Sequence, residues 1–373
     1  MLIGVPKEIK THEYRAGLTP ASVRELVHYN HQVLVESTTG EGIGMTDDDY
    51  RDAGATITET GTNIFARSEM IVKVKEPQPE ECRMLREDQI VFTYFHLAPS
   101  PGLTRNLIDA GIVAIAYETV TGPNHTLPLL APMSEVAGRL SIQAGAHCLE
   151  KGQGGKGVLI GGVPGVAPAK VLIIGGGTVG ENAAAMAIGM ETDVTLLDRS
   201  LPRLRQLDAE FSGRVKCVYS TAESIEQYAL KADLVVGAVL NPGAAAPKLL
   251  TEDVIKRMSK GSVFIDVAID QGGCAETSRP TTHLEPTYVK HGIVHYCVSN
   301  MPGAVPRTST FALNNATLPF ILALANQGYK PAMQEDHHLL NGLNIHKGRI
   351  TNAAVARDLG YDYQPGIEAI GAG

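Results

Sequence analysis

The feature that most constrains this chain is a short apolar run that passes directly into a glycine-rich turn and a helix-forming segment. The run Val171–Ile174 is followed by Gly175, Gly177 and Gly180 in the pattern G-x-G-x-x-G. A tight turn, a backbone that approaches a phosphate and a helix packed closely on its strand each favour a residue without a Cβ atom. Unpaired N–H groups at the start of the helix then attract an anion. The pattern predicts a dinucleotide-binding strand, turn and helix.

A carboxylate at the end of the next predicted strand narrows the choice of dinucleotide. Asp198 follows Gly180 by 18 residues, close to the spacing expected of the acid that binds the ribose diol. A carboxylate there accepts a hydrogen bond from the 2′-hydroxyl and repels a 2′-phosphate. NAD is therefore predicted rather than NADP, although Arg199 and Arg203 follow closely. A glycine-rich turn that binds nothing is the alternative at this point.

Composition favours a folded, soluble protein with more than one domain. The chain has 373 residues, of which 44% are hydrophobic and 19% charged. A net charge of −8 without a basic cluster argues against a nucleic-acid partner, and no apolar run approaches the roughly 20 residues of a membrane span. The five cysteines are widely spaced without C-x-x-C, which predicts reduced thiols and no metal site. The first residues resemble no signal peptide, so the expected location is the cytoplasm.

Alternating strand and helix signals predict an α/β fold with two doubly wound parallel sheets. In the first third, β-rich runs follow an N-terminal strand, and the helix after it is expected to begin at Thr19-Pro20. These runs are Val33–Val35, Met70–Val74, Ile90–Phe95 and Ile112–Tyr117. The middle third carries six candidate strands, the complement of a full Rossmann fold. They are Val171–Ile174, Val194–Leu197, Val215–Tyr219, Leu234–Leu240, Val263–Ile269 and Ile293–Val298.

The domains are expected to be interleaved along the chain. Strand signals stop after Pro306, where only helices are expected, so this tail should pack back on the first domain. The prediction is a discontinuous domain of residues 1–130 and 306–373, with a Rossmann domain of residues 131–305 inserted into it. A long helix over Pro132–Lys151 would begin the inserted domain. The end, Gly366–Gly373, has no pattern and is expected to be loose.

Polar residues directly after predicted strands mark the candidate site, since ligands bind outside the carboxyl ends of parallel strands. Lys75, His96 and Asp270 each follow such a run, and Arg15 lies in the loop after the first strand. We expect a pocket between the domains in which Arg15 binds a carboxylate through two parallel hydrogen bonds. Lys75 would contact a carbonyl oxygen, and His96 and Asp270 would move protons or orient water. This set suits a small α-keto or α-amino acid.

Each of these residues also has a structural interpretation. Arg15 and Lys75 could be solvated charges, His96 could be a structural residue, and Asp270 could cap the turn into Gly272. Glu118, which follows the strand ending at Tyr117, is interpreted as structural.

Taken together, these motifs resemble the alanine dehydrogenase/transhydrogenase family, and specifically its NAD-dependent alanine dehydrogenases. The resemblance rests on Gly4–Glu8 with Arg15, on Val72–Pro77, on Tyr94–Ala98 and on Gly161–Gly180, and it extends to about Tyr363. It implies the reversible NAD-dependent conversion of L-alanine to pyruvate and ammonium in alanine catabolism. It also implies a homohexamer.

The resemblance further implies roles for individual residues. Arg15 and Lys75 would bind substrate, and His96 and Asp270 would be the catalytic acid/base pair. The residues expected around the cofactor are Ser134, Gly175, Gly177, Thr178, Val179, Gly180, Asp198, Arg203, Ser220, Val239, Leu240, Val267, Ala268, Ile269, Asp270, Arg279, Val298, Ser299, Asn300 and Met301.

Three other functions compete with this interpretation. The soluble NAD(H)-binding component of a proton-translocating transhydrogenase would share the fold but would not need the Arg15, Lys75, His96 and Asp270 set. A saccharopine dehydrogenase would act on a bulkier substrate. A catalytically silent NAD sensor would bind NAD without alanine-dependent formation of NADH.

Overall fold

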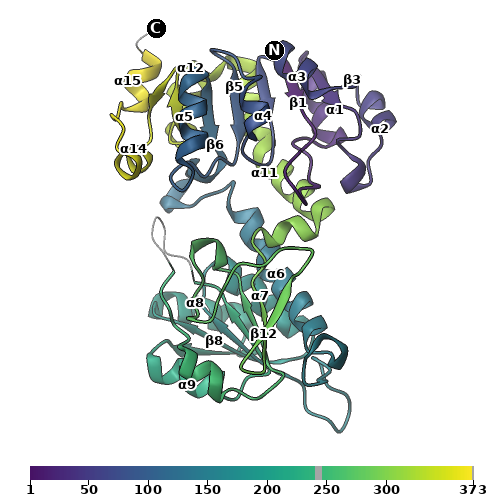
Figure 1. Ribbon diagram of the computed structural model, residues 1–373, viewed down its shortest axis with the longest axis vertical. Coiled ribbons are helices and arrows are strands. Elements are labelled where there is room, and N and C mark those ends of the chain that lie inside the picture. Colours follow the sequence, from purple (N-terminus) through teal and green to yellow (C-terminus); the bar gives the residue numbers. More distant parts are fainter. Residues whose placement is uncertain (240–245, 372–373) are drawn as a thin grey trace. The chain divides into compact units, whose positions relative to one another are not determined.

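The computed structural model describes residues 1–239 and 246–371, without the side chain of His125. The chain divides into two compact units (Figure 1). Unit 1 comprises Met1–Met133 and Val305–Gly373, and unit 2 comprises Ser134–Ala304. Each unit contains one sheet with flanking helices, so the predicted α/β fold class is confirmed. Leu240, a predicted cofactor residue, lies outside the described residues.

The sheet of unit 1 has eight strands in the order β15-β14-β6-β5-β4-β1-β2-β3. The six from β3 to β6 are mutually parallel. Strands β4, β5 and β6 are buried along their whole length, as expected for a parallel sheet covered on both faces. The strands of unit 1 are β1 Leu2–Val5, β2 Gln32–Glu36, β3 Thr56–Thr58, β4 Met70–Val72, β5 Ile90–Thr93, β6 Val113–Ala116, β14 Leu343–His346 and β15 Arg349–Ile350.

The helices of unit 1 come from both segments of the chain. They are α1 Pro20–His28, α2 Asp47–Asp52, α3 Gly61–Arg67, α4 Pro79–Cys82, α5 Pro101–Asp109, α11 Pro306–Gln327, α12 Tyr329–Glu335, α13 His337–Leu340, α14 Ala353–Leu359 and α15 Gly366–Gly371. Helix α1 begins as predicted, because the Thr19 side chain accepts a hydrogen bond from the N–H of Ser22 and Pro20 occupies the first turn.

The C-terminal tail differs from the prediction in two ways. It is not purely helical, because β14 pairs antiparallel with β6 and β15 pairs antiparallel with β14. Helix α13 ends at Leu340, and β14 begins at Leu343. Residues 366–371 are not a loose end either, because Ala369 and Ile370 of α15 are buried, while residues 372 and 373 lie outside the described part of the chain.

The sheet of unit 2 has the order β12-β13-β11-β10-β7-β8-β9. Its six parallel strands follow the order of a dinucleotide-binding fold, with β7 as the first strand at the centre. All six were predicted, whereas the antiparallel edge strand β12 was not. The strands are β7 Lys170–Ile174, β8 Asp193–Asp198, β9 Val215–Tyr219, β10 Leu234–Gly237, β11 Val263–Asp266, β12 Thr287–Lys290 and β13 Ile293–Tyr296.

Helix α6, Ala131–Cys148, lies close to the unit 2 sheet because it has glycines on its packed side. A Cβ atom on Gly138 would lie 2.2 Å from the carbonyl oxygen of Val179, and one on Gly145 would lie 2.5 Å from Leu234. The other helices of unit 2 are α7 Thr178–Gly189, α8 Leu201–Phe211, α9 Ala222–Ala229 and α10 Glu252–Arg257. Within the described ranges, no helix is long and apolar enough to cross a membrane.

Candidate active site

The three glycines of the turn after β7 each meet a different steric demand. Gly175 has a φ of 107°, and a Cβ atom on it would lie 2.5 Å from the carbonyl oxygen of Ala238. A Cβ atom on Gly180 would lie 1.8 Å from the carbonyl oxygen of Gly175, so this glycine permits close packing of α7. A Cβ atom on Gly177 would have no atom within 4 Å, which leaves open space at the N-terminus of α7, beside Thr178 and Val179. A pyrophosphate fits this arrangement.

Asp198, at the end of β8, is bonded directly to the glycine turn. One carboxylate oxygen accepts from the N–H of Gly176 at 2.7 Å, and the other accepts from the N–H of Ser200 at 2.7 Å. The Arg203 side chain donates from Nε to the carbonyl oxygen of Gly176 at 2.6 Å and forms an ion pair with Glu181. The carboxylate that would bind the ribose thus also fixes the loop that would bind the phosphates.

The remaining predicted cofactor residues of unit 2 mostly follow neighbouring strands. The parallel strands β7, β10, β11 and β13 end at one edge of the sheet, and the segments after the last three carry Val239, Val267–Asp270 and Val298–Met301. The backbone N–H of Ser220, after β9, donates to the Asp198 carbonyl oxygen at 2.9 Å. Ser134 is half-buried in the first turns of α6.

The segment after β11 is held by Asp266, a fully buried residue whose pKa is raised by burial. Its carboxylate accepts from the Ser278 hydroxyl at 2.5 Å and from the N–H of Cys274 at 2.9 Å. Asp270 itself is exposed in the short 3₁₀ turn Ile269–Gln271. The guanidinium carbon of Arg279 lies 4.1 Å from the centroid of the Tyr288 ring.

Arg15 is buried in the loop between β1 and α1, so its interpretation as a solvated residue is wrong. Its side chain is only 2% exposed. Its Nε and Nη2 donate to the two Glu13 carboxylate oxygens at 2.7 and 2.6 Å. Burial raises the pKa of Glu13, but the hydrogen bonds and charge of Arg15 outweigh it, so the pKa is lowered overall.

Helix α11 fixes the loop that carries Arg15. The N–H of Ala16 donates to the Thr310 hydroxyl at 3.2 Å, and the N–H of Thr19 donates to the Asn314 side chain at 2.8 Å. The amide group of Asn314 in turn donates to the carbonyl oxygen of Gly17 at 3.1 Å. These bonds hold the backbone that directly follows Arg15.

Lys75 is partly buried just beyond β4. Burial lowers the pKa of its ammonium group, and the positive charges of Arg15 and Lys10 lower it further. Such a group binds an anion and also releases a proton more readily than an ordinary lysine.

His96, just beyond β5, is exposed and has a left-handed backbone with a φ of 49°. The N–H of His96 donates to the Glu118 carboxylate at 2.6 Å, and the N–H of Phe95 donates to it at 3.1 Å. Glu118 therefore has the structural role expected of it. The imidazole lies parallel to the Tyr94 ring, with 6.0 Å between centroids. Unit 1 therefore collects Arg15, Lys75 and His96 after β1, β4 and β5, which are neighbours in its sheet.

Most of the chain matches two consecutive family models. Residues 4–137 match "Alanine dehydrogenase/PNT, N-terminal domain", and residues 141–353 match "Alanine dehydrogenase/PNT, C-terminal domain". This chain belongs to the alanine dehydrogenase/PNT family. The resemblance inferred from the motifs is confirmed.

Individual members of the family are similar over nearly the full length. The chain is 57% identical to an alanine dehydrogenase of Halomonas elongata, covering 100% of both chains. It is 52% identical to one of Mycolicibacterium smegmatis, covering 96% of this chain and 97% of the relative. A solved L-alanine dehydrogenase superposes with a TM-score of 0.94 at 52% identity over 96% of this chain and 99% of that one. A transhydrogenase of Sinorhizobium meliloti has a TM-score of 0.83 at 21% identity, over 94% and 100%, and shares the fold.

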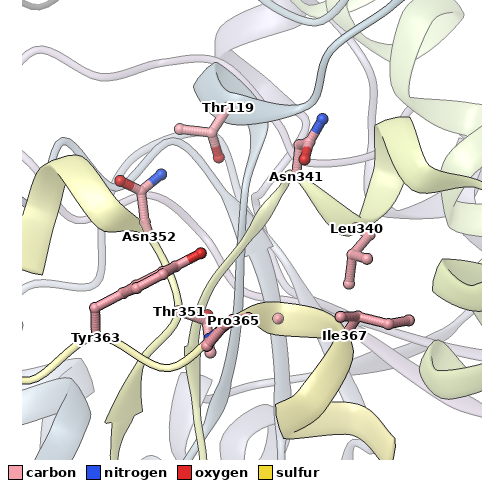
Figure 2. Close-up of a pocket in the computed structure, with 9 residues that line it drawn as sticks. Thr119, Leu340, Asn341, Thr351, Asn352, Tyr363, Pro365 and Ile367 are labelled. Atoms are coloured by element: carbon pink, nitrogen blue, oxygen red, sulfur yellow. The ribbon is translucent and has the colours of Figure 1, made fainter.

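A pocket of about 430 Å³ elsewhere in unit 1 contains none of the predicted site residues (Figure 2). Its lining includes Thr119, Asn341, Asn352 and Tyr363 and no charged side chain. An amino acid would find no charged partner there, so this pocket does not compete with the Arg15 group as a substrate site. In the part of the chain that the structure describes, no group of three or more His, Cys, Asp or Glu residues is arranged to hold a metal.

Sequence reasoning missed the buried carboxylates that hold Arg15 and the backbone of Lys75 in unit 1. Glu13 holds the Arg15 guanidinium, and Glu8 lies behind Lys75 with Lys73 and Glu81. One signal was available, because Lys73 interrupts the apolar run Met70–Val74 at a position where a partnered charge is required.

Proposed function

We propose that this chain catalyses the reversible oxidative deamination of L-alanine to pyruvate and ammonium with NAD. The observation that carries the proposal is the 57% identity to an alanine dehydrogenase over the full length of both chains. The glycine turn, with open space at Gly177 and a carboxylate at Asp198, supports NAD as the cofactor. When bound, NAD supplies the carbon that accepts a hydride from the substrate.

In this proposal the groups of unit 1 bind and orient the substrate. Arg15 pairs with the substrate carboxylate, and Glu13 fixes the plane of the guanidinium. The Lys75 ammonium donates to the substrate oxygen or shares the carboxylate, and its lowered pKa suits a donor to a carbonyl group. Fixed charges of this kind stabilise the charge that develops during reaction.

Proton transfer is assigned to His96 and Asp270. An imidazole can take a proton from the substrate amine or from water near neutral pH. A carboxylate can hold the ammonium group or orient the attacking water. The proposed cofactor residues are those of the glycine turn with Ser134, Asp198, Arg203, Ser220, Val239, Leu240, Arg279 and the segments 267–270 and 298–301.

The direct test is absorbance at 340 nm, the usual window for NADH, with the purified protein, NAD and a panel of small amino acids. Alanine should give the highest rate, and pyruvate with ammonium should drive the reverse reaction. NAD binding without alanine-dependent NADH would refute the proposal in favour of a sensor. Hydride exchange between two nucleotides without alanine would favour a transhydrogenase component.

Asp198 should set the preference for NAD over NADP. Replacing it in Asp198→Ala should remove the ribose contact and the repulsion of a 2′-phosphate. The ratio of kcat/KM for NAD to that for NADP is then expected to fall at least about tenfold, a difference of about 1.4 kcal/mol. Comparable turnover with NADP in the unaltered protein would contradict this assignment.

The proposal extends to a homohexamer acting in alanine catabolism in the cytoplasm. Light scattering coupled to gel filtration should give the mass of six chains. A monomer at the concentration of the activity assay would remove the hexamer from the proposal.

A further inference from the structure

Three charged side chains are buried together behind the turn that carries Lys75. The Lys73 side chain is 0% exposed, and those of Glu8 and Glu81 are 2% and 3% exposed. The Lys73 ammonium lies 3.2 Å from Glu8 Oε2 and 2.6 Å from Glu81 Oε1. Glu8 lies in the loop after β1, Lys73 directly follows β4, and Glu81 belongs to helix α4.

Stability alone does not account for this group. Removing two carboxylates and an ammonium from water costs about as much as their attraction returns, and apolar residues of similar size often serve as well. The contacts made by the second carboxylate oxygen of each glutamate indicate a role beyond stability. The other oxygen of Glu81 accepts from the N–H of Gln78 and closes the first turn of α4.

The other oxygen of Glu8 bonds to the backbone at Lys75. It accepts from the N–H of Val74 at 2.7 Å and from the N–H of Lys75 at 3.3 Å. On the next peptide, the Thr93 hydroxyl donates to the Lys75 carbonyl oxygen at 3.0 Å. The N–H and the carbonyl oxygen of Lys75 are thereby both hydrogen-bonded, although Lys75 lies beyond the end of β4.

We propose that Glu8, held by Lys73, is a positioning residue that fixes the direction in which the Lys75 ammonium meets the substrate. The inference rests on the proposed function, in which Lys75 binds the substrate. Glu8 touches no substrate itself. Its effect on the reaction passes through the backbone of Lys75.

The test is a double-mutant cycle in the full-length enzyme with Glu8→Gln, Lys75→Ala and the combination. Glu8→Gln keeps the side-chain volume but cannot offer oxygens to both the backbone N–H groups and Lys73. Because a misdirected Lys75 ammonium would lose its charge-assisted hydrogen bond to the substrate, we expect the KM for pyruvate to rise about ten- to hundredfold. The KM for NADH should stay within about twofold. With Lys75 already removed, adding Glu8→Gln should change the KM for pyruvate by less than about twofold.

Two results would overturn the inference differently. An equal effect of Glu8→Gln with and without Lys75 would show that Glu8 does not act through Lys75, and would leave the proposed function intact. An unchanged KM for pyruvate in Lys75→Ala would remove Lys75 from the substrate site and Glu8 with it.

Matched variants separate positioning from a general packing defect. Ile71→Val shortens a fully buried side chain on β4 and should leave the KM for pyruvate unchanged. If Glu8→Gln yields no folded protein, Glu8→Asp decides, since the shorter side chain keeps the charge beside Lys73 but withdraws the carboxylate from the N–H groups of Val74 and Lys75. A rise of about threefold or more in the KM for pyruvate is expected, and an unchanged value would overturn the inference.

Discussion

Glu13 and Arg15 form a buried pair whose strength depends on the carboxylate being ionised. The pKa of Glu13 is lowered from its ordinary value of 4.5, so the pair stabilises the folded protein above that pH. Glu13→Gln should lower the free energy of unfolding near neutral pH by about 3–5 kcal/mol, because Arg15 keeps a buried charge without its counter-ion.

The same variant predicts a pH dependence. A lowered pKa means that the contribution of Glu13 is lost as the pH falls through its folded-state value. The difference in stability between the two proteins should therefore shrink below pH 4.5. Urea unfolding near neutral pH and about one unit below that value measures it. A difference that stays constant with pH would contradict the assignment.

The left-handed backbone of His96 decides which substitution tests its role. Alanine at a φ of 49° is strained, whereas asparagine adopts this conformation readily. His96→Asn should lower kcat by about 10²- to 10⁴-fold through loss of proton transfer. NADH affinity, measured by fluorescence titration, should be unchanged. Full activity in this variant would remove His96 from the proton-transfer step.

Much of the candidate site could be predicted residue by residue, because strand ends place particular side chains at one edge of a sheet. Lys75 and His96 were predicted in this way, Arg15 from its loop after the first strand, and Asp198 from its spacing after Gly180. The buried group behind Lys75 could not be predicted from sequence, since Glu8, Lys73 and Glu81 meet only after three separate segments have packed. The positive φ of His96 likewise depends on the fold around it.

At the scale of elements, alanine substitutions at two glycines of the turn after β7 should have different effects on stability and NADH binding. Gly180→Ala places a Cβ atom 1.8 Å from a backbone oxygen, so α7 must move and unit 2 should lose stability as well as NADH binding. Gly177→Ala meets nothing within 4 Å and has a φ of −70°, so the protein should fold normally and lose only affinity.

Thermal unfolding and NADH titration distinguish the two variants. Gly189→Ala is the control, because it lies in the same helix with open space around its Cβ position. Its free energy of unfolding should equal that of the unaltered protein or be higher by up to about 0.5–1 kcal/mol, since alanine favours a helix over glycine. Equal stability of Gly180→Ala and Gly177→Ala would refute the packing role of Gly180.

Elements with long apolar runs were predictable, and short or mixed ones were not. The six parallel strands of unit 2 are rich in valine, isoleucine and leucine. Strand β14 reads Leu-Asn-Ile-His, and its partner β6 lies far away in the sequence, so no local pattern marks the pairing. Helix α15 has only two buried residues, too few for a periodic signal.

At the scale of the whole molecule, the two units differ in how they are built from the chain. The core of unit 1 combines residues from both segments, including Val91, Ala114, Ile345 and Val355. A core of unit 2 is formed within one continuous stretch, from Leu172 to Ile293. Continuity in sequence means that unit 2 needs no distant segment to complete this core.

Residues 131–304 are therefore expected to fold as an independent protein and to bind NADH. The segment contains α6, whose glycines pack on Val179 and Leu234, and the complete seven-stranded sheet. Its urea unfolding should be cooperative, and its NADH affinity should fall about tenfold or more when Gly177→Ala is introduced. It should produce no NADH from alanine, because Arg15, Lys75 and His96 all belong to unit 1. A segment that stays unfolded at neutral pH would show that unit 2 depends on the rest of the chain for its stability.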